Sequence, residues 1–443
     1  MPSRSLLPVG ASREEVARTE VGHTTVSPAI VRLLMAGFLT AIVVVPVVEL
    51  AGLRALRTQG LTNAWSHLAR LPADLGSKAP DSAVSTPESV SVWQHLVVAN
   101  RNVLAAISRF ELGLEDESLL GRTLRPPTQS VLTGSLGAGN ERVYRGREGW
   151  LFYRPDVEYL TGRGFLDPAE LRRRVAAVSE WETPPQPDPR LAIARFQRDL
   201  EARGITLVVV PTPLKPSVHP EKLARRYADG AGVLQNPSYR EFVEAMTRDG
   251  VLVFDPSDVL GPARRAGAQY LVSDTHWRPE TMEAVAGQLA AFIEAHVDLP
   301  ASADPGYRIE RQEVRNTGDT VQMLDLPAET TLYSAEAVYL RRVVQADGSP
   351  WRSSREADVL VLGDSFSNIY TLESLGWGTS AGFVEQLSYG LRRPVDRLVQ
   401  NDQGAFATRA MLGRDSRRLD GKRVLVYQFA ARELAFGDWQ VIP

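Results

Sequence analysis

The chain has 443 residues, of which 44% are hydrophobic and 23% charged, so it is long and apolar enough to bury one large core or two ordinary ones. Its formal net charge of −3 argues against a protein built mainly to hold nucleic acid. It contains no cysteine, which excludes disulfides and thiolate metal sites.

The first predicted element is an apolar helix close to the N-terminus. No charged residue lies between Arg32 and Glu49, and the apolar flanks extend this run toward the ~20 residues that cross a bilayer core. A buried core helix and a cleaved signal peptide are the alternatives, but the run lacks a polar face and follows an unusually long leader. We therefore predict a short cytoplasmic tail at 1–29 and a transmembrane anchor at 30–53. Arginines on both sides leave the orientation poorly fixed by charge.

Residues 54–140 are predicted to be a linker with juxtamembrane helices. The stretch 72–89 is rich in Pro, Ser and Ala without periodicity, which is typical of a linker. Apolar residues recur at helical spacing over 92–112. This helix either covers the following domain or presents its apolar face to a membrane partner, and the pattern leaves both alternatives open.

From about residue 190 the pattern alternates between short apolar runs and amphipathic helices. Continuous Val and Leu runs bounded by turn residues are typical of strands buried on both faces. We therefore predict an α/β domain over 141–443, with a mainly parallel sheet and flanking helices. The predicted strands are 205–211, 251–255, 358–364, 396–402 and 423–429.

Ser365 is the candidate nucleophile, because it follows one of these strands through Gly363-Asp364 and precedes a predicted helix over 365–376. Ligands of parallel sheets bind beyond the carboxyl ends of the strands. A serine at such an end exposes its hydroxyl beside the free N–H groups of the first helical turn, which can stabilise an oxyanion. The competing interpretation is a helix cap with no catalytic role.

A second candidate element is the segment SDTHWRPE, which contains Asp274 and His276. Two residues of separation place them on different faces of a helix, so we expect them in the loop before a helix that begins near Pro279. From a loop, the Asp274 carboxylate can hold one imidazole nitrogen and leave the other for a serine hydroxyl. Trp277 is then expected to form a wall of the site. Taken alone, such a pattern is also typical of a surface turn.

Four further residues are weaker candidates for oxyanion or substrate binding. Lys215 follows a strand and can reach the site, although an exposed loop lysine is the simpler interpretation. Asn401 and Gly404 follow the strand at 396–402, where one of them can complete an oxyanion hole. Arg432 follows the last strand and can hold an anionic group. No group of His, Asp and Glu shows convincing metal-ligand spacing, so no metal is predicted.

Several motifs together resemble the membrane-anchored alginate O-acetyltransferases of the AlgJ and AlgX type, which are members of the wider SGNH-hydrolase-like group. The resemblance covers roughly residues 141–440, and the order of its two main blocks matches the acetyltransferase branch and not ordinary SGNH esterases. In that family the corresponding residues form a catalytic triad, which implies Asp274, His276 and Ser365 here. The motifs are VYRGREGWLFY, VVVPTPLKPSVHPEKL, SDTHW, TGDTVQML, VLGDSFS and AARELAFGDW.

The resemblance also implies a function. It implies an inner-membrane protein whose catalytic domain lies in the periplasm and acetylates an exported polysaccharide through an acyl-serine intermediate. No dinucleotide or phosphate loop is visible, so no bound cofactor is predicted. The expected partners are the polysaccharide and a multi-spanning membrane acyltransferase that relays the acetyl group. Two alternatives remain, a polysaccharide esterase with the same triad and a non-catalytic polysaccharide-binding protein.

Overall fold

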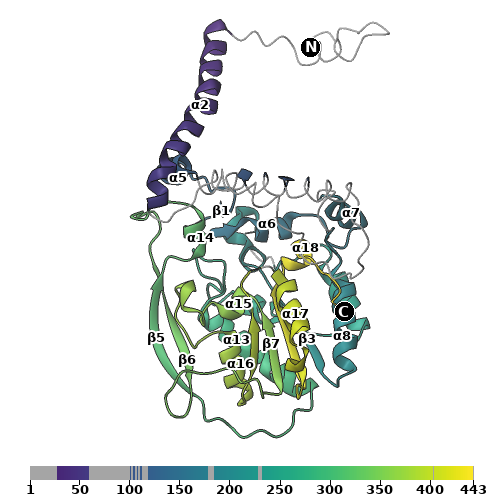
Figure 1. Ribbon diagram of the computed structural model, residues 1–443. Helices are drawn as coiled ribbons and strands as arrows, with labels where there is room; N and C mark the ends of the chain where they lie inside the picture. The colour runs from purple at the N-terminus through teal and green to yellow at the C-terminus, as the bar shows by residue number, and fades with distance from the viewer. Residues whose placement is uncertain are drawn as a thin grey trace, which may run out of the picture. The chain divides into compact units, whose positions relative to one another are not determined.

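The computed structural model describes residues 27–58, 100, 103–104, 107, 110–111, 118–177, 184–227, 232–402 and 404–442 (Figure 1). The chain forms two compact units, Met1–Arg125 and Pro126–Pro443, and each is described by itself. The predicted linker at 72–89, most of the helix predicted at 92–112 and nearly all of the predicted tail lie outside the described residues.

The first unit contains the apolar helix that the sequence predicts. Helix α2 spans Pro28–Thr58. Its segment Pro28–Val48 has a mean hydropathy of 2.4 and none of it is buried, so the helix is long and apolar enough to cross a membrane. Pro46 lies inside the helix. A proline removes one backbone hydrogen bond and favours a kink.

The centre of the second unit is a five-stranded parallel sheet. The strand order is β4-β3-β9-β7-β8, and every pairing between neighbours is parallel. All residues of β7 and β9 are buried, as the continuous apolar runs predict. All five predicted strands are therefore confirmed. The strands are β3 (Thr206–Thr212), β4 (Leu252–Val253), β7 (Val359–Gly363), β8 (Asp396–Val399) and β9 (Val424–Ala430).

Helices cover both faces of this sheet (Figure 1). With right-handed crossovers, the strand order places α11 and α17 on one face and α13 and α16 on the other. The contacts agree, because α11 packs against α8 and α13 packs against α16. The main helices are α8 (Pro189–Glu201), α11 (Tyr239–Arg248), α12 (Ser257–Ala263), α13 (Pro279–His296), α16 (Phe383–Leu391) and α17 (Gly404–Arg414).

Two antiparallel hairpins lie outside the central sheet and are absent from our sequence-based prediction. The strands β1 (Val143–Arg145) and β2 (Leu151–Tyr153) form one. The longer pair, β5 (Arg308–Asn316) and β6 (Glu336–Val344), forms the other. The connection of this second hairpin contains the short helix α14 (Asp319–Met323), which carries Asp319. Further short helices are α6 (Arg154–Thr161), α7 (Pro168–Ala176), α9 (Lys215–Val218), α10 (Pro220–Leu223) and α18 (Glu433–Phe436).

Helix α5 (Leu119–Leu136) contributes to the second unit ahead of the domain boundary predicted at residue 141. Its side chains of Gln129 and Thr133 are buried. The Gln129 amide donates to the carbonyl of Gly139, and Arg145 donates to the carbonyl of Thr133 at 2.9 Å. The residues that pack with the α/β domain thus extend upstream to Pro126.

Candidate active site

Ser365 lies at the carboxyl end of β7, where the chain turns into the short helix α15 (Ser365–Asn368). Its side chain is partly exposed, whereas its neighbours Asp364 and Phe366 are buried. As the first residue of a helix, Ser365 has a backbone N–H with no partner within that helix. The helix is much shorter than the predicted 365–376. It ends at Asn368, and a single helical turn follows at Glu373–Leu375.

The turn before Ser365 is held in place by Asp364 and Gln428. The Asp364 carboxylate accepts hydrogen bonds from the backbone N–H of Phe366, from the Gln428 amide and from the N–H of Ala430. Gln428 in turn accepts from Asp364 N and from the Ser367 hydroxyl. These bonds tie the end of β7 to β9. Asp364 is therefore a positioning residue for Ser365.

Gly363 has a steric reason to be glycine. A Cβ at this position would lie 2.4 Å from the Ser367 hydroxyl oxygen. Any larger residue would push the first turn of α15 away from the strand.

Asp274 and His276 form a buried hydrogen-bonded pair in the loop before α13, as the sequence predicts. The Nδ1 of His276 lies 2.6 Å from Asp274 Oδ1, and the backbone N–H of His276 donates to the same oxygen. The other oxygen of Asp274 accepts from the indole of Trp377 at 2.8 Å and from the N–H of Asp319 at 3.0 Å. With Nδ1 held by Asp274, the free lone pair of a neutral His276 is on Nε2.

The His276 loop and the Ser365 helix contact each other directly through Phe366. The rings of His276 and Phe366 have centroids 4.8 Å apart, and the indole of Trp277 donates to the carbonyl of Phe366 at 3.1 Å. Tyr370 donates its hydroxyl hydrogen to the carbonyl of Trp277. The fold thus brings the predicted base next to the residue that follows the predicted nucleophile. Within the described residues, His276 Nε2 is buried and has no hydrogen-bond partner.

Trp277 has a different place from the one expected. We predicted that it forms a wall of the site, but its side chain is fully buried and packs against Phe366 and Phe383. Trp277 thus connects the loop of His276 to the helix of Ser365 through buried contacts. A buried indole cannot offer its face to a substrate.

A second carboxylate, Asp319, lies beside the Asp274–His276 pair. It accepts hydrogen bonds from the backbone N–H and the hydroxyl of Thr275, and its Oδ2 lies 3.7 Å from His276 Nδ1. Gly318 permits this approach, because it has a φ of +82° and a Cβ would lie 2.2 Å from the carbonyl oxygen of Ser273. The motif TGDT offered this residue in the sequence, but nothing there indicated that it would reach His276.

The electrostatics of these three groups follow from burial and from each other. Burial alone would raise the pKa of Asp274, but His276 and the hydrogen bonds from it and from Trp377 lower this pKa to about 2. Burial and the charge of Asp274 raise the pKa of Asp319 to about 6. Burial opposes protonation of His276, but the two carboxylates outweigh it and raise the pKa of the imidazole. The site thus holds an ionised Asp274 next to a comparatively basic imidazole.

The same three side chains have the spacing of a metal site. Asp274, His276 and Asp319 offer ligand atoms that lie within 4.8 Å of one another. However, the Nδ1 atom that faces these carboxylates is the one that lies 2.6 Å from Asp274. A metal ion on Nδ1 and a proton shared with Asp274 exclude each other. The hydrogen-bonded pair accounts for the arrangement without a metal ion.

Lys215 is not the exposed loop lysine that the sequence suggested. Its side chain is fully buried, and its ammonium donates to the carbonyls of Leu151, Val272 and Asp274 at 2.6, 2.7 and 3.0 Å. Burial lowers the pKa of Lys215 to about 7. All three donors of the ammonium are used by backbone oxygens. Lys215 therefore supports the loop of Asp274 and does not face the place of a substrate.

Arg432 lies beside Phe366 and is paired with Asp156. Its guanidinium donates to Asp156 at 2.8 Å and lies over the rings of Tyr153 and Phe366. The side chain retains an exposed fraction of 17%. No local pattern indicated Asp156 as its partner, because the two residues are 276 positions apart in the chain.

Asn401 and Gly404 both lie beyond the carboxyl end of β8. Asn401 accepts a hydrogen bond from the amide of Asn368 in the helix of Ser365, at 2.8 Å. Gly404 begins α17 with a φ of +59°, and a Cβ there would lie 2.1 Å from a carboxylate oxygen of Glu433. The side chain of Asn401 is thus linked to the Ser365 helix. Gly404 is instead explained by the lack of space for a Cβ next to Glu433.

Comparisons with known proteins agree on one family. A model of the SGNH hydrolase-like domain of the acetyltransferase AlgX matches residues 143–431. The probable alginate O-acetylase AlgJ of Pseudomonas aeruginosa is 27% identical over 307 residues, which are 67% of this chain and 71% of that protein. The probable alginate O-acetylase AlgJ of Azotobacter vinelandii is 28% identical over 172 residues, which are 38% of either chain.

A solved structure shows the same fold. The O-acetyltransferase domain of Pseudomonas putida AlgJ superposes with a TM-score of 0.51 and 20% sequence identity. The match covers 67% of this chain and 93% of that domain. The predicted SGNH-like α/β fold is confirmed.

Proposed function

The chain belongs to the family of SGNH hydrolase-like acetyltransferase domains of the AlgX type, and we propose that it transfers acetyl groups to hydroxyls of an exported polysaccharide through Ser365, His276 and Asp274. The observation that carries this proposal is the contact between the Asp274–His276 pair and Phe366, the residue next to Ser365. The relatives are probable alginate O-acetylases, which supports an acidic polysaccharide as the acceptor.

In the first half of the reaction, His276 Nε2 removes the hydroxyl proton of Ser365 as its Oγ attacks the acetyl carbonyl carbon of the donor. Asp274 holds the imidazole by Nδ1 and stabilises the imidazolium that forms. The backbone N–H of Ser365 is a candidate donor to the oxyanion, and Asn401 is a candidate for a second. Collapse of the tetrahedral intermediate expels the donor group, which takes the proton from His276 and leaves an acetyl-serine.

In the second half, an acceptor hydroxyl replaces the donor group. His276 removes its proton as the hydroxyl oxygen attacks the acetyl-serine, and the proton then returns to Ser365 as the sugar ester leaves. Water in place of the sugar would give acetate instead. The difference between a transferase and an esterase thus depends on which hydroxyl occupies this position.

We place the catalytic domain on the outer side of the bacterial inner membrane, with α2 as its anchor. The apolar helix Pro28–Val48 supports the anchor. Activated acetyl donors are cytosolic, so a site outside the membrane requires a relay. We propose that a multi-spanning membrane acyltransferase supplies the acetyl group and that no cofactor stays bound to this chain.

The test is a pair of serine substitutions in one helix. Ser365→Ala should abolish acetylation of the polysaccharide. On incubation with an acetyl donor, mass spectrometry should find an acetyl adduct on the wild-type protein and none on the variant. Ser367→Ala is the matched control, since its hydroxyl binds Gln428 and not a substrate, and it should lower thermal stability but keep transfer. Undiminished acetylation by a folded Ser365→Ala protein would refute the proposal.

A further comparison separates the transferase from its alternatives. The protein is incubated with a generic acetyl ester, with and without a glycan acceptor. A transferase yields acetylated glycan, whereas an esterase yields only acetate. A binding protein yields neither product and keeps its affinity for glycan when His276 is replaced.

A further inference from the structure

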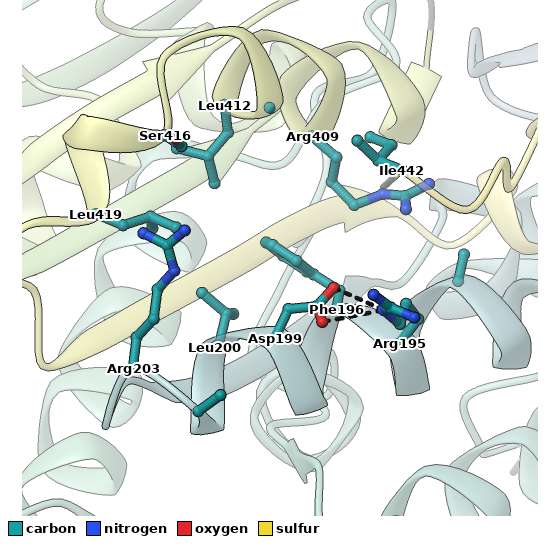
Figure 2. A pocket seen from close by; sticks show the side chains of 13 residues that line it. Arg195, Phe196, Asp199, Leu200, Arg203, Arg409, Leu412, Ser416, Leu419 and Ile442 are labelled. Atoms are coloured by element: carbon teal, nitrogen blue, oxygen red, sulfur yellow. Dashed lines mark hydrogen bonds and ion pairs between the residues drawn. The ribbon is translucent and has the colours of Figure 1, made fainter.

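A groove lies between α8 and α17, away from the edge of the sheet that carries Ser365. It has a volume of about 350 Å³, and Figure 2 shows its walls. Both helices pack over the same strand, because Phe196 of α8 and Arg409 of α17 both contact Tyr427 of β9. The groove extends to Arg203 and Leu419, which precede the amino ends of β3 and β9. Ser365 lies at the opposite, carboxyl end of β7, a strand of five residues that spans about 16 Å.

One wall of the groove contains a buried cation with an unused donor. Arg409 is only 3% exposed, and it donates from Nε to the Tyr427 hydroxyl and from Nη1 to the carbonyl of Gln440. Across the ranges that the structure describes, its Nη2 is buried and has no hydrogen-bond partner. A buried guanidinium nitrogen without an acceptor is unfavourable, so an incoming oxygen ligand would satisfy it.

The rest of the lining favours an anion that carries an apolar part. Three arginines and one aspartate line the groove, and Arg195 is already paired with Asp199 at 3.0 Å. Arg203 is exposed and extends toward Leu419 on the facing wall (Figure 2). The remaining walls are largely apolar, with Phe196, Leu200, Leu412 and Ile442.

We propose that this groove is a second binding site, which takes an organic carboxylate. The carboxylate would accept a hydrogen bond from Nη2 of Arg409, and the charge of Arg203, which lies at the other end of the groove in Figure 2, would attract it. The remainder of the ligand would lie on the apolar wall. An acidic sugar of a polymer and a free organic acid share this chemistry, and the binding experiment separates them.

The experiment measures binding to the full-length protein in detergent by titration calorimetry. The probes are an oligomer of four uronic acids, an uncharged oligosaccharide of equal length, and sodium butyrate. Binding of the uronic oligomer without butyrate identifies an acidic polymer as the source, and equal binding of butyrate identifies a free organic acid. Equal affinity for the uncharged oligosaccharide, or no binding of any probe, overturns the proposal.

Variants locate the binding in the groove. Arg203→Gln removes an exposed partner, and Ser416→Asp places a competing carboxylate at the exposed rim, so neither depends on the buried Arg409. Each should weaken carboxylate binding about tenfold or more. The control is Arg198→Gln, an exposed arginine of α8 outside the groove, which should bind like the wild type. Unchanged affinity in Arg203→Gln and Ser416→Asp refutes the site.

Catalysis provides an independent reference. None of these variants touches Ser365 or His276, so turnover of a small acetyl ester should stay at the wild-type level. A protein that binds the carboxylate but has no ester turnover would contradict the proposed function, and the proposed binding site in the groove would still stand. The two proposals can therefore fail separately.

Discussion

At the scale of single residues, the site depends on two carboxylates that act on one imidazole. Asp274 accepts from His276 and is stabilised by Trp377 and by the N–H of Asp319. Asp319 adds a second negative charge at 3.7 Å from the same nitrogen. Both charges favour protonated His276, and burial opposes them. The net effect is a raised pKa, which makes the imidazole a stronger base in its neutral form.

The pH dependence of activity should report this arrangement. His276 must be neutral to accept a proton, so kcat/KM should rise with pH, with a midpoint above the ordinary histidine pKa of 6.5. Asp319→Asn removes one of the charges that raise the pKa of His276, and an amide oxygen can still accept from the N–H of Thr275. The midpoint should therefore move to lower pH. The measurement is a pH–rate profile on an acetyl ester.

The control for this prediction is Asp274→Asn. It removes the group that holds Nδ1, so it should reduce kcat by about 10³- to 10⁴-fold, as expected for loss of a triad carboxylate. A profile in Asp319→Asn with an unchanged or higher midpoint would show that Asp319 does not act on His276.

At the scale of elements, Lys215 links segments that lie far apart in the chain. From α9 it donates to the carbonyl of Leu151 in β2 and to two carbonyls in the loop that carries His276, those of Val272 and Asp274. Burial makes the charged form of this amine less favourable and lowers its pKa to about 7. A single side chain thus connects the first hairpin to the loop that positions His276.

Replacement of Lys215 by methionine tests this link. Three buried carbonyls would lose their donor, so Lys215→Met should reduce the free energy of unfolding by about 1–3 kcal/mol or more. Between pH 7 and 10.5, Lys215 binds more protons in the unfolded wild-type chain than in the folded one. The free energy of unfolding of the wild type therefore rises with pH across this interval. The advantage over Lys215→Met should therefore grow across this interval.

Denaturant titrations at several pH values measure this advantage. An advantage that is constant with pH would show that the lysine titrates normally in the folded protein. Lys222→Met is a suitable reference, because Lys222 is a partly exposed partner of Glu148.

At the scale of the whole molecule, α2 and the α/β domain serve separate purposes. Among the described residues of the first unit, none buries the apolar surface of Pro28–Val48, whereas the second unit has its own core. A water-exposed helix of this length is unfavourable, and a bilayer would remove that cost. The domain carries all the residues of the candidate site.

Membrane fractionation tests the anchor. Deletion of residues 1–58 should move the protein from the membrane to the soluble fraction. The double substitution Leu39→Arg and Val43→Arg should make the free energy of membrane insertion less favourable by about 2.5–3.5 kcal/mol per charge. Protease added from the outer face of the inner membrane should digest the C-terminal domain of the wild-type protein. Protection of that domain would contradict the proposed location.

The sequence by itself determined the features that depend on local pattern. Buried strands have continuous Val and Leu runs, an amphipathic helix repeats near 3.6 residues, and a membrane helix needs only length and apolarity, so the five strands, α8, α11, α13 and α2 were predictable. The blocks around Asp274 and Ser365 pointed to the family for the same reason. Each is a contiguous motif.

Only the tertiary structure decided which distant residues meet. Lys215 and the Asp274 loop, Arg432 and Asp156, and the Asp364–Gln428 pair are partners separated by 57 to 276 positions in the chain. A side chain in a loop is exposed or buried according to what folds over it, so Lys215 was expected at the surface and Trp277 at the wall of the site. Local sequence carries no record of such long-range packing, because a partner's burial and charge come from elements elsewhere in the chain.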